Sequence, residues 1–355
     1  MKILITGVSG FVGSRLALAL KNRVESVEIR GIDNFLRPGS ETNRAPLEAH
    51  GVHFVHGDVR SRSDVDGLPP CDWVIDAAAN PSVLAAVDDR SSPRQVTEHN
   101  LMGTLNLLEY CREHKAGLVL LSTNRVYSVR HLAALPLLER ANAFALDPGH
   151  ALPPGVSDAG LTEAFPVSQP ISFYGATKLA SEIMAIEYGS TFGFPVWVNR
   201  CGVLAGAGQF GTAEQGIFSY WVHAHAAQRP LRYIGFEGHG YQVRDAFHPD
   251  DLAALAAIQM RREPPADPIY HAGGGAANST SLAQLTRWCD ERFAKNVPEP
   301  DLRPRPFDIP WLVMDSARAR VDLGWIPERS LTTILDEIAE HARNHPDWLA
   351  RSRAI

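Results

Sequence analysis

Tyr174 and Lys178 lie four positions apart in a predicted helix that opens at about residue 172 and continues through Tyr188. Residues at this spacing share one face of a helix, so the phenol and the ammonium are expected to lie close together. A free phenol has a pKa near 10, about three units too high for a base at neutral pH, and a neighbouring cation lowers it. The pair is therefore a candidate acid–base centre, although a surface Tyr–Lys pair would show the same spacing.

The segment at residues 7–13 has the glycine-rich sequence GVSGFVG. It follows an apolar run at residues 2–5, typical of a buried parallel strand, and precedes a helix-forming run at residues 14–20. A glycine loop in this position presents backbone N–H groups and the positive end of a helix dipole to an anion. It predicts a dinucleotide site, with a tight turn that binds no ligand as the alternative. The expected contacts in this loop are Gly7, Gly10, Phe11, Val12 and Gly13.

Asp33 ends the next predicted strand, about twenty residues beyond Gly13, where a carboxylate accepts hydrogen bonds from the adenosine ribose in dinucleotide-binding folds. Because this carboxylate would repel a 2′-phosphate, the sequence favours NAD over NADP as the cofactor. Arg37 could pair with such a phosphate if Asp33 turned away. A strand-end turn is the alternative role for Asp33 and Asn34.

Other candidate cofactor contacts follow predicted strands, because ligands gather at the carboxyl ends of strands in such folds. Asp58 is expected to face the adenine, and the small residues at 77–79 would permit close approach, although ordinary packing explains them nearly as well. Asn100 is the polar residue that could reach inward from a predicted helix at residues 95–115. The expected contacts of this group are Asn34, Asp58, Val59, Ala77, Ala78, Ala79, Asn100 and Ser122.

Composition excludes several classes of protein. The 355-residue chain has a net charge of -6 and no basic run to suggest a nucleic-acid partner. Its four cysteines lie far apart without a C-x-x-C pair, which favours reduced thiols and a cytoplasmic protein. His223 and His225 are interpreted as part of a helical face, so no metal is expected. No apolar run has the length of a membrane span, and no signal peptide is visible.

Several of these motifs occur together and in order: the glycine loop, Asp33, Asp58, the Ser122-Thr123 strand end, and Tyr174-x-x-x-Lys178. In this the chain resembles the extended short-chain dehydrogenase/reductase family, whose members modify nucleotide-diphospho-sugars. The resemblance spans essentially the whole chain, including Arg200, Arg244-Asp245 and residues 323–327. It implies an α/β fold, with a Rossmann-type doubly wound parallel sheet and a smaller C-terminal α/β substrate-binding domain.

The implied division places a NAD-binding Rossmann domain at residues 1–200. Residues 201–355 would mainly bind the nucleotide-sugar, with some strands returning to the Rossmann sheet. Residues 130–170 are rich in proline and glycine and interrupt the alternation of strands and helices before the helix that carries Tyr174. This segment is expected to be a long loop or small insertion, of the kind that often serves as a lid.

A narrower resemblance is to the CDP-paratose (CDP-tyvelose) 2-epimerases. It rests on residues 122–127 (STNRVY), the Gln209-Phe210 turn, the segments at 55–60, 215–216, 242–245, 273–274 and 278–279, and the long insertion before Tyr174. It implies substrate contacts by Ser82, Asn124, Val203, Gln209, Phe210, Gln215 and Arg244. The chain departs from the family at Val203, Ala205 and the Ser128-Val129 pair, which leaves room for a different sugar.

The resemblance also implies a mechanism. Tyr174, as phenolate, removes the proton from a sugar hydroxyl whose oxygen Thr123 holds. Lys178 lowers the pKa of Tyr174, as a cationic nicotinamide would, and binds the nicotinamide ribose. The sugar carbon gives a hydride to tightly held NAD⁺, and the resulting keto-sugar takes it back on its other face. Arg244 would pair with the diphosphate, and the helices at residues 95–115 and 174–188 would pair in a homodimer or homotetramer.

The residues at the same positions also distinguish between alternative activities on this fold. Nucleotide-sugar 4,6-dehydratases place an Asp-Glu acid–base pair directly after the catalytic threonine, where this chain has Asn124 and Arg125, so dehydration is disfavoured. A UDP-sugar 4-epimerase would use the same three residues, and a related reductase is a further alternative. A non-catalytic NAD(H)-sensing protein would not need Tyr174 and Lys178 at this spacing.

Overall fold

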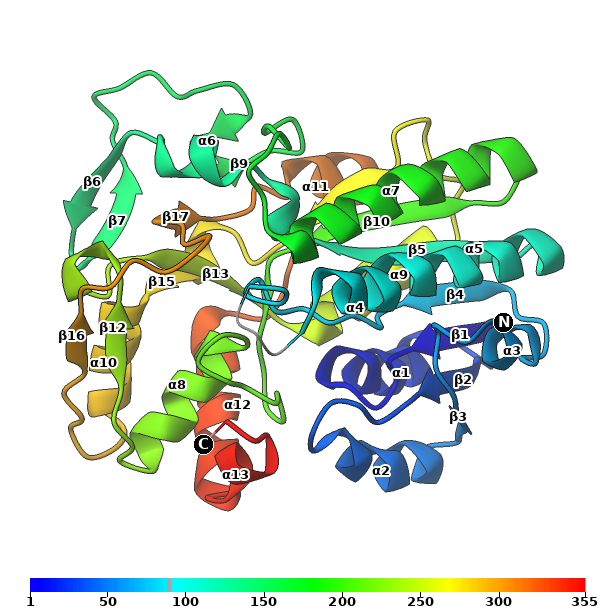
Figure 1. Ribbon diagram of the computed structural model, residues 1–355, viewed down its shortest axis with the longest axis horizontal. Coiled ribbons are helices and arrows are strands. Elements are labelled where there is room, and N and C mark those ends of the chain that lie inside the picture. The colour runs from blue at the N-terminus through cyan, green and yellow to red at the C-terminus, as the bar shows by residue number, and fades with distance from the viewer. Residues whose placement is uncertain (88–90, 355) are drawn as a thin grey trace.

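A computed structural model describes residues 1–87 and 91–354, and the chain is organised around one seven-stranded sheet (Figure 1). All of its strands are parallel, in the order β14-β10-β5-β4-β1-β2-β3. Their bounds are β1 Lys2–Thr6, β2 Glu28–Asp33, β3 Val52–His56, β4 Trp73–Asp76, β5 Gly117–Thr123, β10 Val196–Cys201 and β14 Ile269–Ala272. The strand order runs outward in both directions from the β1–β4 junction, which confirms the predicted doubly wound sheet.

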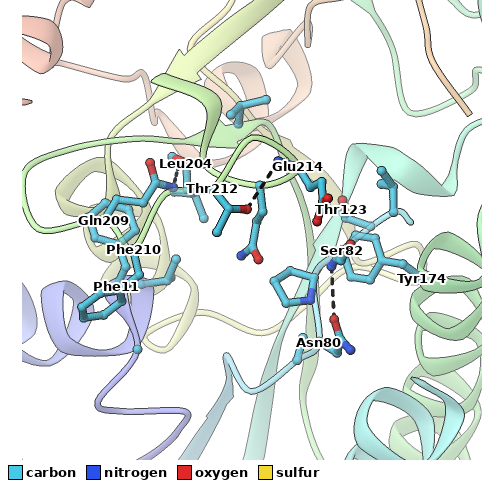
Figure 2. Close-up of a pocket in the computed structure, with 18 of the residues that line it drawn as sticks. Phe11, Asn80, Ser82, Thr123, Tyr174, Leu204, Gln209, Phe210, Thr212 and Glu214 are labelled. Atoms are coloured by element: carbon cyan, nitrogen blue, oxygen red, sulfur yellow. Dashed lines mark hydrogen bonds between the residues drawn. The ribbon is translucent and has the colours of Figure 1, made fainter. Parts of the chain in front are cut away.

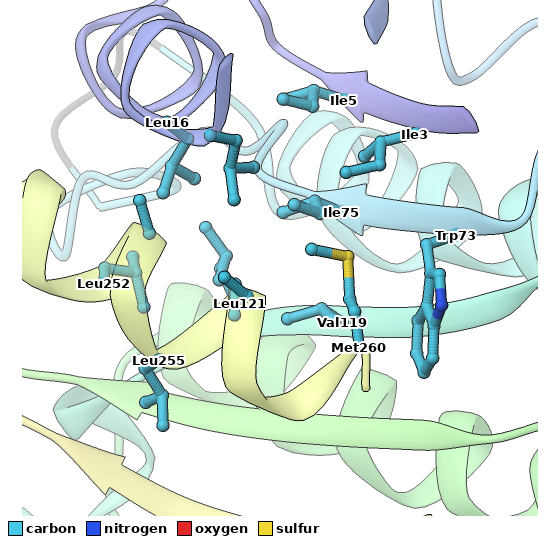
Figure 3. Close-up of a cluster of buried hydrophobic side chains, with 14 of the residues drawn as sticks. Ile3, Ile5, Leu16, Trp73, Ile75, Val119, Leu121, Leu252, Leu255 and Met260 are labelled. Atoms are coloured by element: carbon cyan, nitrogen blue, oxygen red, sulfur yellow. The ribbon is translucent and has the colours of Figure 1, made fainter. Parts of the chain in front are cut away.

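The sheet is buried on both faces by helices. Those that flank it are α1 Phe11–Arg23, α2 Arg44–Ala49, α3 Arg62–Asp66, α4 Pro93–Thr97, α5 Gly103–His114, α7 Phe173–Phe192, α9 Pro249–Gln259 and α11 Ala317–Leu323. Ile3, Ile5 and Ile75 pack with side chains of α1 and α9 (Figure 3). The alternate residues Leu4 and Val74 pack on the opposite face, with α5 and α7. Burial on both faces explains why the central strands β1, β4 and β5 consist mostly of consecutive apolar residues.

The helix predicted at residues 95–115 starts earlier and is irregular at its centre. Ser92 caps α4 by accepting a hydrogen bond from the backbone N–H of Gln95 at 3.2 Å, within a capping box. A π-helical turn, Glu98–Met102, then joins α4 to α5. The interpretation as one regular helix is wrong at this turn, because a single widened turn leaves no mark on the residue types.

Residues 130–170 form a small ordered insertion, which is the second of the two alternatives expected for this segment. Leu161 is fully buried there and exchanges backbone hydrogen bonds of 2.8 Å with Val313 and Asp315. Within the described chain, no residue of this insertion lines the main cavity, which argues against a lid. The elements are α6 Val129–Ala133, the hairpin of β6 Leu137–Arg140 and β7 Ala143–Leu146, and the hairpin of β8 Val156–Ser157 and β9 Gly160–Leu161.

The C-terminal half has smaller sheets of its own. β13 (Val243–Phe247) pairs with β11, β15 and β17, and β12 pairs with β16. The bounds are β11 Val203–Leu204, β12 Arg232–Ile234, β15 Ser279–Ser281, β16 Glu299–Asp301, β17 Trp311–Leu312, α8 Ile217–Ala226, α10 Leu282–Asp290, α12 Leu331–Asn344 and α13 Trp348–Arg351. β14 comes from this half of the sequence yet pairs with β10 in the large sheet. Among the described residues, no helix combines the length and apolarity that a membrane span requires.

Candidate active site

A cavity of about 720 Å³ lies where the carboxyl ends of the large sheet's strands face the C-terminal half (Figure 2). Ligands of open α/β sheets bind at this edge, beside the switch point of the strand order. Asn100 is the one predicted site residue that does not line the cavity. The predicted residues that do are Gly7, Gly10, Phe11, Val12, Gly13, Asp33, Asn34, Asp58, Val59, Ala77, Ala78, Ala79, Ser82, Ser122, Thr123, Asn124, Tyr174, Lys178, Val203, Gln209, Phe210, Gln215 and Arg244.

The glycine loop leaves room for a phosphate at the start of α1. Gly7 has a φ of +61°, a left-handed conformation that favours glycine. A Cβ at Gly13 would lie 2.2 Å from the carbonyl oxygen of Gly7, so a side chain does not fit there. Gly10 is the N-cap residue and brings no side chain to the first N–H groups of α1. These groups are left for an anion, so the loop fits the diphosphate of a dinucleotide.

The carboxylate of Asp33 lies against the glycine loop. It accepts hydrogen bonds from the backbone N–H groups of Ser9 (2.9 Å) and Phe35 (2.8 Å). These bonds lower its pKa, but burial has the larger effect and raises the pKa above its ordinary value. Asn34 donates to Asp58 at 2.9 Å. Partial burial would raise the pKa of Asp58, but the hydrogen bonds from Arg60 and Asn34 hold it below its ordinary value. Two ordered carboxylates thus border the end of the cavity nearest to the glycine loop.

Asn100 forms hydrogen bonds with the loop after β4 and does not line the cavity. It is 1% exposed, accepts a hydrogen bond from the backbone N–H of Asn80 at 2.7 Å, and donates to the Thr177 hydroxyl at 3.0 Å on α7. Asn100 therefore lies behind the wall of the cavity, and its expected contact with the cofactor stays a prediction. Its polar atoms are already used in joining two elements that line the cavity.

Thr123, Tyr174 and Lys178 converge from two elements. Thr123 ends β5, while Tyr174 and Lys178 lie on the first turns of α7, and all three side chains are buried at the cavity wall. Figure 2 shows Thr123 beside Tyr174. A Cβ at Gly175 would lie 2.2 Å from the carbonyl oxygen of Arg125, so glycine lets α7 dock on the turn after β5. Sequence reasoning missed this role of Gly175.

The pKa of Tyr174 differs from the expectation. Burial raises the pKa of Tyr174 to about 12. The hydrogen bond from Thr123 and the charge of Arg125 lower this pKa, but their effect is smaller than that of burial. The expectation of a lowered pKa is therefore wrong for the protein alone. A phenolate in a dry wall loses more hydration energy than these neighbours return.

A buried chain of polar side chains fixes the strand ends behind the site. Ser122 donates to Glu182, which forms an ion pair of 2.7 Å with Arg200. Arg200 also donates to the Tyr127 hydroxyl at 3.1 Å, so that hydroxyl directs its own proton to Nε2 of His271. Burial lowers the pKa of His271 to about 3, which keeps its ring neutral and able to accept. This row of hydrogen-bonded side chains connects β5 with β10, β14 and α7.

Positive charge gathers on the side of the cavity away from the glycine loop. Arg125, Arg244 and Arg305 line it together with the carboxylate of Asp308, which lies 3.7 Å from the Arg244 guanidinium. Burial and the mutual repulsion of the arginines lower the pKa of Arg125 to about 9, and burial lowers that of Arg244 to about 10. Such a cluster fits a dianion such as a diphosphate. Sequence reasoning identified Arg244 alone; Arg305 and Asp308 lie in a proline-rich stretch without a motif.

Several buried polar atoms of the wall have no hydrogen-bond partner in the described chain. Buried polar groups normally do, so orphaned atoms that line a cavity mark places for a polar ligand. Asn124 fits this description best, because it is 5% exposed and its side-chain N–H₂ is unpaired. The orphaned atoms on lining residues are His99 Nε2, Asn124 Nδ2, Gln209 Oε1, Gln242 Oε1 and Asp308 Oδ2.

The family model "NAD dependent epimerase/dehydratase family" matches residues 3–273. The chain is 28% identical to a CDP-paratose 2-epimerase of Salmonella typhi, over 93% of this chain and 96% of that one. It is 26% identical to a dTDP-glucose 4,6-dehydratase of Streptomyces niveus, over 98% and 94%. The structure of a Thermus thermophilus UDP-glucose 4-epimerase in complex with NAD superposes with a TM-score of 0.75 at 26% identity, over 97% of this chain and 99% of that one.

Proposed function

The chain belongs to the NAD-dependent epimerase/dehydratase family, and on that premise we propose that it epimerises a nucleotide-diphospho-sugar, as a CDP-paratose (CDP-tyvelose) 2-epimerase does. Its cofactor is NAD. The observation that carries the proposal is the pair that follows Thr123. Asn124 and Arg125 line the cavity where a dehydratase would need an acid and a base, and neither can exchange those protons at neutral pH.

Tyr174 is proposed as the acid–base residue and Thr123 as the donor that orients the reacting hydroxyl. When bound, NAD supplies a reversible acceptor for one hydride. Lowering the pKa of Tyr174 from about 12 to neutrality requires about 7 kcal/mol of electrostatic stabilisation. Because the charge of Arg125 already contributes to the value of about 12, the further stabilisation would come from the positive charge of the oxidised cofactor, together with the ammonium of Lys178. Tyr174 then takes the hydroxyl proton and returns it when the carbonyl is reduced on its other face.

The remaining contacts divide between cofactor and substrate. We propose that residues 7–13 hold the NAD diphosphate, and that Asp33 binds the adenosine ribose and disfavours a 2′-phosphate. Arg244, with Arg125 and Arg305, would hold the sugar-nucleotide diphosphate. Ser82, Asn124, Val203, Gln209, Phe210 and Gln215 would contact the rest of the substrate.

The proposal that C2 is the inverted carbon is based on the similarity to the CDP-paratose 2-epimerase. Inversion at C4 of a UDP-sugar is the second candidate. Val203 lines the cavity and offers no hydrogen bond, so the sugar is expected to carry fewer hydroxyl groups at that side than a hexose. A non-catalytic NAD(H)-binding role would leave the convergence of Thr123, Tyr174 and Lys178 without a purpose.

We also propose a homodimer or homotetramer formed through α5 and α7. Large apolar side chains are exposed along these helices and the π turn between α4 and α5: Met102 (44%), Phe173 (44%) and Ile183 (62%). A two-fold pairing would bury them. Sedimentation of the wild type and of Ile183→Glu tests this: a wild-type monomer would contradict it.

The function is tested with a panel of CDP- and UDP-sugars, followed by NMR in H₂O and D₂O. An epimer should form without net NADH release and without solvent deuterium at the inverted carbon. Tyr174→Phe should keep NAD but lose turnover by roughly 10²–10⁴-fold. The control is Tyr188→Phe on the same helix, whose hydroxyl bonds Glu109 at 2.7 Å and which does not line the cavity. A stable keto-deoxy product would instead identify a dehydratase, and a near-wild-type rate of Tyr174→Phe would contradict the base assignment.

A further inference from the structure

Arg37 joins two loops that come from opposite halves of the chain. It lies just after Asp33, between β2 and the 3₁₀ turn Ser40–Asn43. Its guanidinium donates to the carbonyl oxygen of Phe210 and, at 3.0 Å, to Oε1 of Gln215. Both acceptors belong to the loop at residues 205–216, which connects β11 to α8. Arg37, Phe210 and Gln215 all line the cavity.

The backbone packs closely along the same seam. Gly39 has a φ of +88°, and a Cβ there would lie 2.9 Å from the ring of Phe210. Phe210 in turn stacks on Trp348 with 5.2 Å between ring centroids, and the Trp348 indole N–H donates to the carbonyl oxygen of Gln209 at 2.9 Å. Phe11, the first residue of α1, belongs to the same cluster (Figure 2). The loop at residues 205–216 is therefore held against the cofactor half at one side.

The direction of the Arg37 side chain also bears on the cofactor. Its two terminal nitrogens donate to Phe210 and Gln215, so the guanidinium points to the opposite loop. Arg37 is partly buried, so the bridge is shielded in part from water, and this burial lowers the pKa of its guanidinium. Charge-assisted hydrogen bonds in such surroundings are stronger than exposed ones.

We propose that Arg37 is a positioning residue that retains NAD, because it fastens the loop at residues 205–216 to the segment beside Asp33. A dinucleotide that lies along the glycine loop and Asp33 is enclosed while this bridge holds. It leaves only after Arg37 releases Phe210 and Gln215, so cofactor exchange is slowed by the strength of the bridge. This role differs from the recognition of a 2′-phosphate.

The test measures release of NAD from the full-length protein. Wild type, Arg37→Met, Arg37→Lys and Arg44→Met are loaded with radiolabelled NAD and chased with excess unlabelled NAD. Arg44 is the matched control, because it lies nearby at the start of α2, pairs with the exposed Glu48 and does not line the cavity. Thermal unfolding of each cofactor-free variant shows that the fold is intact.

Arg37→Met should release NAD roughly tenfold faster or more, since two charge-assisted hydrogen bonds are lost. Arg37→Lys should lie between Arg37→Met and wild type, and Arg44→Met should match wild type. Equal release from Arg37→Met and wild type would overturn the proposal, as would equally fast release from Arg44→Met. A change in NADP affinity alone would overturn it in favour of phosphate recognition. The measurement needs no sugar, so its outcome is separate from that of the proposed function.

Discussion

Replacing Glu182 by glutamine should destabilise the protein by about 3–5 kcal/mol, because it removes the charge from a buried ion pair. The side chains of Glu182 and Arg200 are 1% and 5% exposed, and three N···O distances of 2.7–3.2 Å join them. Ser122 donates to the same carboxylate. Glutamine offers one oxygen, and its N–H₂ would face the donors of Arg200 and Ser122. The guanidinium would then stay buried without a counter-charge.

The loss is measured as the free energy of unfolding in urea, against total stabilities of about 5–15 kcal/mol for natural domains. Glu187→Gln is the control, since this residue is exposed on the same helix, and it should change stability by about 0.5 kcal/mol or less. The double variant Glu182→Leu/Arg200→Met should recover much of the loss, because no buried charge remains. A Glu182→Gln protein within about 1 kcal/mol of wild type would refute the reasoning.

Two other changes test the loop and the buried histidines. Gly13→Ala would place a Cβ 2.2 Å from the Gly7 carbonyl oxygen, so calorimetry should detect no NAD binding, whereas Gly149→Ala at an exposed turn should bind normally. Burial lowers the pKa of His341 to about 3, below its unfolded value near 6.5, so its contribution to stability is present above pH 6.5 and is lost as the pH falls toward 3. Between pH 6 and 4, the unfolding free energy of His341→Gln should fall less steeply than that of wild type, by up to about 1.4 kcal/mol per pH unit. Equal slopes for His341→Gln and wild type would contradict this.

The features that the sequence predicted well depend on residues that lie close together along the chain. The apolar run at residues 2–5 indicated a buried parallel strand, and the cores on the two sides of the sheet confirm it. The glycine loop and the pair Tyr174 and Lys178 could be recognised because spacing along the chain sets their geometry. The structure brings these motifs to one cavity.

The features that sequence missed depend on contacts between distant segments. Asn100 reaches inward, as expected, but its amide is used by Asn80 and Thr177, a fact that requires the positions of two other elements. The raised pKa of Tyr174 follows from burial, which no local spacing reveals. Gly175 is required because α7 touches the turn at Arg125. In each case the deciding partner lies many residues away in the sequence.

The position of β14 also bears on how the chain is made and on where it can be divided. Until Ile269–Ala272 has been synthesised and has folded back, one edge of β10 offers unpaired backbone groups on a strand whose side chains are all buried in the finished fold. An open apolar edge of this kind invites pairing with another chain, and such long-range parallel pairing is slow. A fragment that stops at residue 200 is therefore expected to aggregate. A two-piece complementation design would need its first piece to extend beyond β14.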